Sequence, residues 1–334
     1  MADAIRTILV FRAGGLGDLL VAGPAMAALR RTFPNAELTI AARTTYAELL
    51  VETLQPVRLV EIGSSLFSSL FLADADLPSD GALVKFLRGF DLVVCWLGGA
   101  EEPFARIIRR AGVARVVAAE AHPSPGSHMH TVDYLLGTLA ELGVVQGGEP
   151  WRLEVSAQSR GECEKELLSR GVEAGRRVFA VPPGSGGLSK CWPTERFVSV
   201  AREFGRREGM KIAWILGPAE LERAERFQAD LPAEFVVIAG VALPTLAAIL
   251  SRSSIYLGND SGVTHLAAAV GAPTLALFGP TDPKVWAPRG ECVEVIHRRE
   301  FTKLSEKTVL DRLARLARRQ SGRGALLKSP LHRS

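Results

Sequence analysis

The segment richest in side chains that could take part in binding or catalysis is residues 255–283, IYLGNDSGVTHLAAAVGAPTLALFGPTDP. Apolar runs at 255–258 and 274–278 flank a helix-like run at 263–270, which predicts one β-α-β unit. Its first turn gathers four side chains that can bind an anion or a sugar: Asp260, Ser261, Thr264 and His265. Open α/β sheets bind ligands at such turns, and the N–H groups that begin a helix attract anions. The turn is therefore a candidate phosphate or sugar site.

A second glycine-rich turn follows the apolar run 178–181 and reads PPGSGGLSKCWP over residues 182–193. It lacks the glycine and lysine order of a P-loop. Glycines such as Gly184 still let the backbone approach a ligand, and Lys190 can neutralise a phosphate as a compact charge. A loop lysine is more often simply exposed, but its place after a strand favours a functional role for Lys190.

Acidic residues follow a third strand-like run, 212–216. A carboxylate at this point could accept two hydrogen bonds from a ribose diol, or it could only stabilise the first turn of a helix. Spacing does not separate Glu220 from Glu222, although Glu220 is closer to the strand end.

The first strand, 8–11, leads into a glycine turn and then Asp18. A dinucleotide fingerprint is not met, because Leu20 stands where the last glycine is required and Arg43 stands where a ribose-binding acid is expected. Two interpretations of Asp18 stay open. It caps the following helix, or it acts as a general base for a hydroxyl nucleophile.

Composition narrows the class of protein. The 334 residues, 47% apolar and 23% charged, suggest about two domains with sizeable cores. A formal charge of +4 is too mild to indicate nucleic-acid binding and fits an acidic ligand or an anionic membrane surface.

The four cysteines are scattered without a CxxC pair, and His128 and His130 lack a third ligand, so we expect no metal site, no disulfide framework and a cytoplasmic location. We expect no signal peptide and no membrane span, since Gly271 and Pro273 break the uncharged run at 261–281.

The elements that must position these residues alternate between strand and helix. Expected strands lie at 8–11, 38–41, 59–62, 92–95 and 116–118, then at 178–181, 212–216, 236–238, 255–257 and 274–278. Expected helices lie at 19–33, 46–54, 104–111 and 132–142, then at 197–207, 221–231, 243–250 and 263–270. Strands separated by helices imply parallel sheets. We expect two doubly wound, Rossmann-like α/β domains that face each other across a cleft, residues 1–155 and 156–334, and we keep open a contact of the last helix, 306–319, with the first domain.

Together, these segments resemble glycosyltransferase family 9, the ADP-heptose:lipopolysaccharide heptosyltransferases. Similarity runs from about residue 7 to 290 and is clearest at ILVFRAGGLGDLLVAGPAMAALRRTFPNAELTI, PPGSGGLSKCWPTERFVSVA and GNDSGVTHLAAAVGAPTLALFGPTDP. The resemblance implies a GT-B fold with the donor nucleotide mainly on the second domain and the acceptor on the first. It also implies an inverting, metal-independent transfer without a cofactor, from ADP-heptose to a lipopolysaccharide-core or related surface glycan.

The same resemblance assigns roles to individual residues. Asp18 matches the general base, with Gly15 and Gly17 on the acceptor side, and Lys190 matches the residue that supports the diphosphate. The implied donor site comprises Gly184, Ser185, Lys190, Glu220, Asp260, Ser261, Gly262, Thr264 and His265. Asp260, an anion close to the expected diphosphate, would cap the helix or contact a sugar hydroxyl.

Two other functions compete with this one. A nucleotide-sugar epimerase or dinucleotide oxidoreductase would keep the phosphate site and need no acceptor, and a glycan-binding module would bind without releasing a nucleoside diphosphate. For the transferase we expect a nucleotide-sugar donor and a glycolipid acceptor as partners, no nucleic acid, and a cytoplasmic protein. We keep open a peripheral contact at the cytoplasmic face of the inner membrane.

Overall fold

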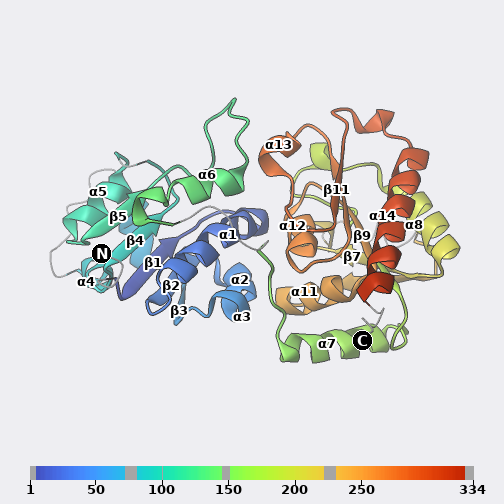
Figure 1. Ribbon diagram of the computed structural model, residues 1–334, viewed down its shortest axis with the longest axis horizontal. Coiled ribbons are helices and arrows are strands. Elements are labelled where there is room, and N and C mark those ends of the chain that lie inside the picture. The colour runs from blue at the N-terminus through green and yellow to red at the C-terminus, as the bar shows by residue number, and fades with distance from the viewer. Residues whose placement is uncertain (1–4, 72–80, 100, 145–150, 222–230, 328–334) are drawn as a thin grey trace, which may run out of the picture. The chain divides into compact units, whose positions relative to one another are not determined.

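The computed structural model describes residues 5–71, 81–99, 101–144, 151–221 and 231–327. The chain divides into two compact units, residues 1–154 and 155–334. Figure 1 shows that each unit is built around its own sheet, with helices packed on the strands. We describe each unit by itself.

The first unit contains a parallel sheet with the order β3-β2-β1-β4-β5. Its strands are β1 (Thr7–Phe11), β2 (Glu37–Ala42), β3 (Arg58–Glu61), β4 (Leu92–Cys95) and β5 (Arg115–Ala118). Its helices are α1 (Leu16–Thr32), α2 (Thr44–Ala47), α3 (Val51–Leu54), α4 (Ala82–Leu87), α5 (Pro103–Arg110) and α6 (Thr131–Gly137). The chain reverses its direction of winding between β1 and β4, so a topological switch point lies between the loops that follow these two strands.

The second unit contains a parallel sheet with the order β11-β10-β9-β6-β7-β8. Its strands are β6 (Val178–Val181), β7 (Lys211–Leu216), β8 (Phe235–Ala239), β9 (Ile255–Asn259), β10 (Thr274–Phe278) and β11 (Val293–His297). Its helices are α7 (Ala157–Ser169), α8 (Thr194–Glu208), α9 (Pro218–Leu221), α11 (Leu243–Arg252), α12 (Gly262–Ala269), α13 (Pro283–Trp286) and α14 (Glu306–Leu327). Here the switch point lies between β6 and β9.

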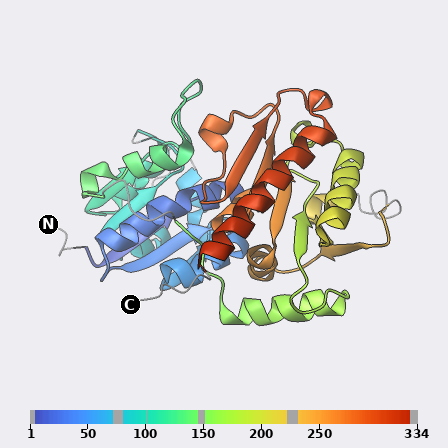
Figure 2. The same cartoon turned by 45° about the vertical axis from the view of Figure 1, so that its right-hand side comes forward.

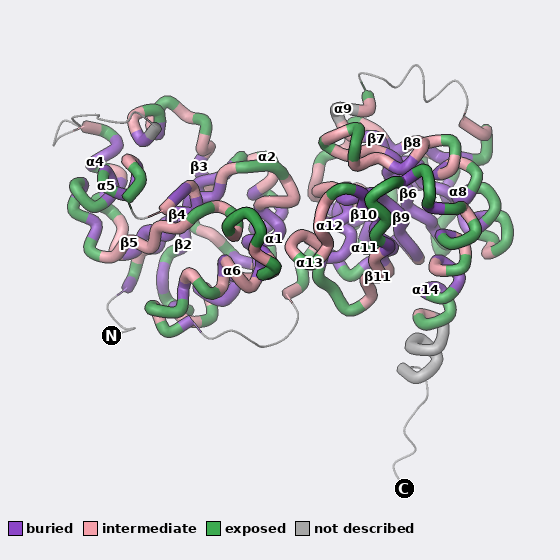
Figure 3. Tube along the Cα trace, turned by 90° about the horizontal axis from the view of Figure 1, so that it is seen from above, coloured by how far each residue is buried: buried purple, intermediate pink, exposed green. Residues whose placement is uncertain are grey.

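Burial explains why the strands read as continuous apolar runs. Every residue of β4, β6, β9 and β10 is buried, because helices cover both faces of a parallel sheet. Figure 3 shows this buried centre in each unit, with the exposed positions on the outer helices and loops.

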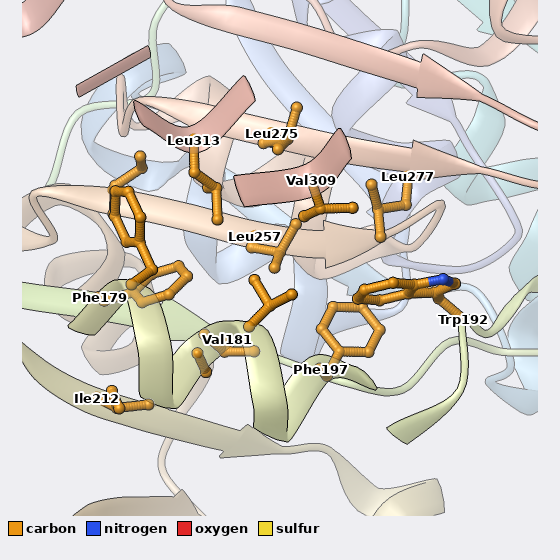
Figure 4. Packing of buried hydrophobic residues seen from close by; sticks show 14 of the residues in the cluster. Phe179, Val181, Trp192, Phe197, Ile212, Leu257, Leu275, Leu277, Val309 and Leu313 are labelled. Atoms are coloured by element: carbon orange, nitrogen blue, oxygen red, sulfur yellow. The ribbon is translucent and has the colours of Figure 1, made fainter. Parts of the chain in front are cut away.

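Helix α14 belongs to the core of the second unit. Its apolar face contributes Val309 and Leu313 to a cluster that contains Trp192 and Phe197 (Figure 4). In Figure 2 the helix, in red, lies across the strands of its own unit. The rings of Trp192 and Phe197 meet edge to face at 5.2 Å, and Trp192 Nε1 donates to the Leu304 carbonyl at 3.3 Å. The Trp-Pro pair after Lys190 is therefore a structural anchor for the preceding loop.

Several elements differ from the sequence-based expectation. The predicted helix 46–54 is broken into α2, a 3₁₀ turn and α3, while β11 and α7 were not predicted. Helix α7 begins directly after the predicted domain boundary at 155/156, because Ser156 caps it by accepting a hydrogen bond from the Ser159 N–H at 2.9 Å. Most of the predicted helix 221–231 falls outside the described residues.

The uncharged run at 261–281 is divided between α12 and β10. Among the helices of the described ranges, none has the length and apolar character needed to cross a membrane.

Candidate active site

The loop after β6 is joined to the turn after β9 in the second unit. Ser185 Oγ donates to the Asp260 carbonyl at 2.6 Å. The Asn259 side chain bridges the same two segments, since its Nδ2 donates to the Pro183 carbonyl at 2.7 Å and its Oδ1 accepts from the Trp192 N–H at 3.0 Å. The two glycine-containing motifs thus form one structure at the carboxyl ends of neighbouring strands.

Lys190 and Asp260 form an ion pair at this junction. Lys190 Nζ lies 2.8 Å from Asp260 Oδ2, and the lysine side chain is 40% exposed while the aspartate side chain is only 8% exposed. Asp260 does not cap α12, because Ser261 is the capping residue. The carboxylate instead fixes the ammonium group beside the start of the helix, where the partial positive charge of the helix also lies.

The first turn of α12 is held together from within. Ser261 Oγ accepts a hydrogen bond from the Thr264 N–H at 3.4 Å, and the Thr264 hydroxyl donates to the Asn259 carbonyl. The Tyr256 hydroxyl lies 2.8 Å from Thr264 Oγ1, and burial raises the pKa of this tyrosine. Thr264 is fully buried and His265 is 8% exposed, so their side chains shape the turn from inside the unit.

Glu220 reaches the same edge from the end of β7. Its Oε2 accepts the Gly217 N–H at 3.0 Å, and a Cβ atom at Gly184 would overlap its carboxylate group. Because β9, β6 and β7 are adjacent, the residues 184, 190, 220 and 260 belong to the ends of three neighbouring strands. Glu222, the other candidate acid, lies outside the described residues.

Asp18 occupies the corresponding edge of the first unit. Its Oδ2 accepts the Gly15 N–H at 2.8 Å, which makes it part of the cap of α1. Its Oδ1 lies 2.8 Å from His122 Nε2 and 3.6 Å from Arg12 Nη2. The turn that precedes it requires glycine, since Gly14 has a φ of +112° and a Cβ there would lie 2.6 Å from Asp18 Oδ2. Asp18 therefore caps its helix and also faces other polar side chains.

The charge state of Asp18 follows from these contacts. Partial burial pushes the pKa of the carboxyl group up, but hydrogen bonds from His122 and the Gly15 N–H and the charge of Arg12 outweigh it. The pKa of Asp18 consequently lies below its usual range. At neutral pH the side chain is a carboxylate and can accept a proton.

Comparison with known proteins identifies the family. Residues 107–316 match the pattern described as Glycosyltransferase family 9 (heptosyltransferase), which is more than half of the chain. The chain belongs to glycosyltransferase family 9. Lipopolysaccharide heptosyltransferase 3 of Escherichia coli K12 is 23% identical to it over 319 residues, 89% of each chain.

Solved structures share the fold of this family 9 glycosyltransferase. E. coli ADP-heptose lps heptosyltransferase II is similar with a TM-score of 0.74 at 18% identity, covering 94% of this chain and 99% of that one. E. coli heptosyltransferase WaaC with ADP is similar with a TM-score of 0.65 at 18% identity, covering 93% and 99%. The fold with two parallel sheets is thus GT-B, and the epimerase and oxidoreductase alternatives are not favoured.

Some residues that contact the candidate site were missed by sequence reasoning. Arg12, His122 and Asn259 were not singled out. His122 does follow β5, whose carboxyl end lies at the same sheet edge as Asp18, and that placement was the available signal.

The histidine pair at 128 and 130 was considered as a possible metal pair. His130 caps α6 by accepting the Val132 N–H at 3.2 Å. Within the described ranges, no group of three or more His, Cys, Asp or Glu side chains is placed to hold a metal ion.

Proposed function

We propose that this glycosyltransferase moves a heptose from ADP-heptose to a lipopolysaccharide-core or related surface glycan acceptor, with inversion at the anomeric carbon. The heptosyltransferase relatives support this donor and acceptor class. The observation that carries the proposal is the joining of Lys190, Glu220 and the start of α12 at one sheet edge.

In this proposal the second unit binds the donor. Glu220 accepts hydrogen bonds from the ribose hydroxyls, and Gly184 and Ser185 let the backbone approach the nucleotide. Lys190 and the N–H groups at Ser261 and Gly262 contact the diphosphate. As the bond between the sugar and the diphosphate breaks, negative charge grows on the departing oxygen, and these groups stabilise it most in the transition state. In this proposal the lysine and the N–H groups stabilise the charge of the departing diphosphate, a role that a divalent cation has in other enzymes.

Asp18 is the proposed general base on the acceptor side, beside Gly15 and Gly17. The acceptor hydroxyl oxygen attacks the anomeric carbon, the bond to the diphosphate breaks, and the hydroxyl proton passes to Asp18. A sugar hydroxyl is a weak nucleophile until a base accepts its proton in the transition state. The proposed donor residues belong to the second unit and Asp18 to the first.

We also propose that the protein acts in the cytoplasm, where a nucleotide sugar is available, with a peripheral contact at the inner membrane. From Arg312 onward the sequence holds seven basic residues and no acid, which would favour an anionic lipid surface.

The test is a transfer assay with ADP-heptose and a panel of core-truncated lipopolysaccharides, following ADP release and product mass. Asp18→Asn should lower turnover by about 10²–10⁴-fold while ADP binding survives, because the base is lost and the nucleotide site is untouched. Glu37→Gln is the matched control, since Glu37 is an exposed carboxylate at the opposite end of the same sheet. Turnover should persist in a metal chelator. Near-normal turnover of the Asn variant would remove the base assignment, and no transfer to any acceptor would overturn the function.

A further inference from the structure

His122 and Asp18 are brought together from positions 104 residues apart in the chain. The ring nitrogen Nε2 lies 2.8 Å from Asp18 Oδ1. Asp18 is ionised, so a short contact to its oxygen requires that Nε2 carry the hydrogen and donate it. The imidazole thus fixes one oxygen of the carboxylate while the Gly15 N–H fixes the other.

A buried arginine holds the two segments in register. Arg12 is only 2% exposed, and its Nε donates to the Asp18 carbonyl at 2.9 Å while Nη1 donates to the Ala121 carbonyl at 2.8 Å. It therefore binds the residue that bears the carboxylate and the residue that precedes His122. Among the described residues its remaining nitrogen, Nη2, has no hydrogen-bond partner, and it lies 3.6 Å from Asp18 Oδ1. Burial of a guanidinium group is costly, and it lowers the pKa of Arg12. The buried guanidinium group is therefore unfavourable by itself, and what it provides is a fixed position of Asp18 relative to the segment that carries His122.

We propose that His122 is a positioning residue for the transfer reaction, which orients Asp18 toward the acceptor hydroxyl. This inference rests on the proposed role of Asp18 as the general base. An imidazole that donates to Asp18 Oδ1 at 2.8 Å holds the carboxylate in one direction, so the other lone pairs of the carboxylate stay aimed at the proton that it accepts.

The surroundings of His122 suit a positioning role. Asp18 on α1 contacts the imidazole, and Arg12 after β1 binds the carbonyl of the preceding residue, Ala121. Glu120, on the same loop, accepts the Gly99 N–H at 3.1 Å. The His122 side chain is 43% exposed, so its replacement leaves no large cavity.

The experiment compares His122→Ala with His122→Gln in the transfer assay with ADP-heptose and lipopolysaccharide. The Ala variant should lose about 10–100-fold in kcat, the size of one charge-assisted hydrogen bond at the base, with the KM for ADP-heptose unchanged. The Gln variant keeps a donor at the position of Nε2 and should recover most of that loss. His128→Ala, an exposed histidine of the same loop, is the control.

Rescue by the conservative variant separates positioning from a merely structural role. If the Ala and Gln variants unfold at the wild-type temperature while only the Ala variant loses kcat, the effect lies on Asp18 and not on the fold. An Ala variant with wild-type kcat, or a Gln variant that loses as much kcat as the Ala variant, would overturn the inference while leaving Asp18 as the base. Full turnover of Asp18→Asn would instead show that the proposed function of Asp18 itself had failed.

Discussion

At the residue scale, the ion pair of Lys190 with Asp260 sets the charge of the proposed donor site. The ammonium group lies 2.8 Å from a carboxylate that is nearly buried. A bound diphosphate would share this ammonium group, so the lysine would interact with the Asp260 carboxylate and the diphosphate at the same time. Because the negative charge of the diphosphate grows as the sugar leaves, the lysine should matter more for turnover than for binding.

Lys190→Gln tests this argument while keeping a hydrogen-bond donor for Asp260. We expect ADP affinity to fall by about 10–100-fold, the effect of one charge-assisted contact, and kcat to fall by a larger factor. Titration calorimetry with ADP and the transfer assay measure the two quantities. Lys303→Met is the control, because Lys303 is a 70% exposed lysine that pairs with Glu300. Equal losses in affinity and kcat/KM with an unaltered kcat would contradict the role in the transition state.

At the scale of elements, the loop after β6 can pack against the residues that follow β7 because Gly184 leaves room for the Glu220 side chain. Gly184 lies against the Glu220 carboxylate, and that carboxylate also accepts the Gly217 N–H at 3.0 Å. The loop and the first turn of α9 are therefore fitted to one another. The same loop is fixed on its other side to the turn after β9 by Asn259.

Gly184→Ala should displace Glu220 without unfolding the unit, since the far end of a flexible side chain can move. We expect ADP to bind at least about tenfold more weakly, as the carboxylate loses its position for the ribose. Gly186→Ala is a matched control in the same loop, because a Cβ there has open space around it. Combining Gly184→Ala with Glu220→Ala should add little to either single loss. Additive losses would show that the glycine acts independently of Glu220.

At the scale of the whole molecule, two units with parallel sheets each place polar residues at the carboxyl ends of their strands. Each sheet has a switch point, between β1 and β4 in one and between β6 and β9 in the other. The proposed donor residues all belong to the second unit, and Asp18, Arg12 and His122 all belong to the first. A nucleotide alone should therefore stabilise one unit.

ADP should raise the thermal stability of the protein more than UDP or GDP does. Ligand bound only to the native state adds about 2.7 kcal/mol when its concentration is 100 times Kd. Differential scanning fluorimetry with the three diphosphates measures the preference. Hydrogen exchange should show protection at 184–190 and 259–265, and not around Asp18. Equal stabilisation by all three nucleotides would contradict an ADP-specific site.

The sequence by itself determined much of the local structure and the identity of the motifs. Strands such as Leu92–Cys95 and Thr274–Phe278 could be predicted because residues buried on both faces form unbroken apolar runs. The polar turns could be predicted because each follows such a run directly. The 3₁₀ break after α2 and the short edge strand β11 could not, since neither has a strong period of its own.

Only the tertiary structure decided which turns meet. Strand order places β9 beside β6, and this pairing brings Asp260 to Lys190 across 70 residues of sequence. Burial of Arg12 likewise brings His122 onto Asp18, a contact that no local pattern contains. The physical reason is the same in both cases. Side-chain periodicity reports which face of an element is buried, whereas hydrogen bonding between strands that are distant in sequence determines which residues become neighbours.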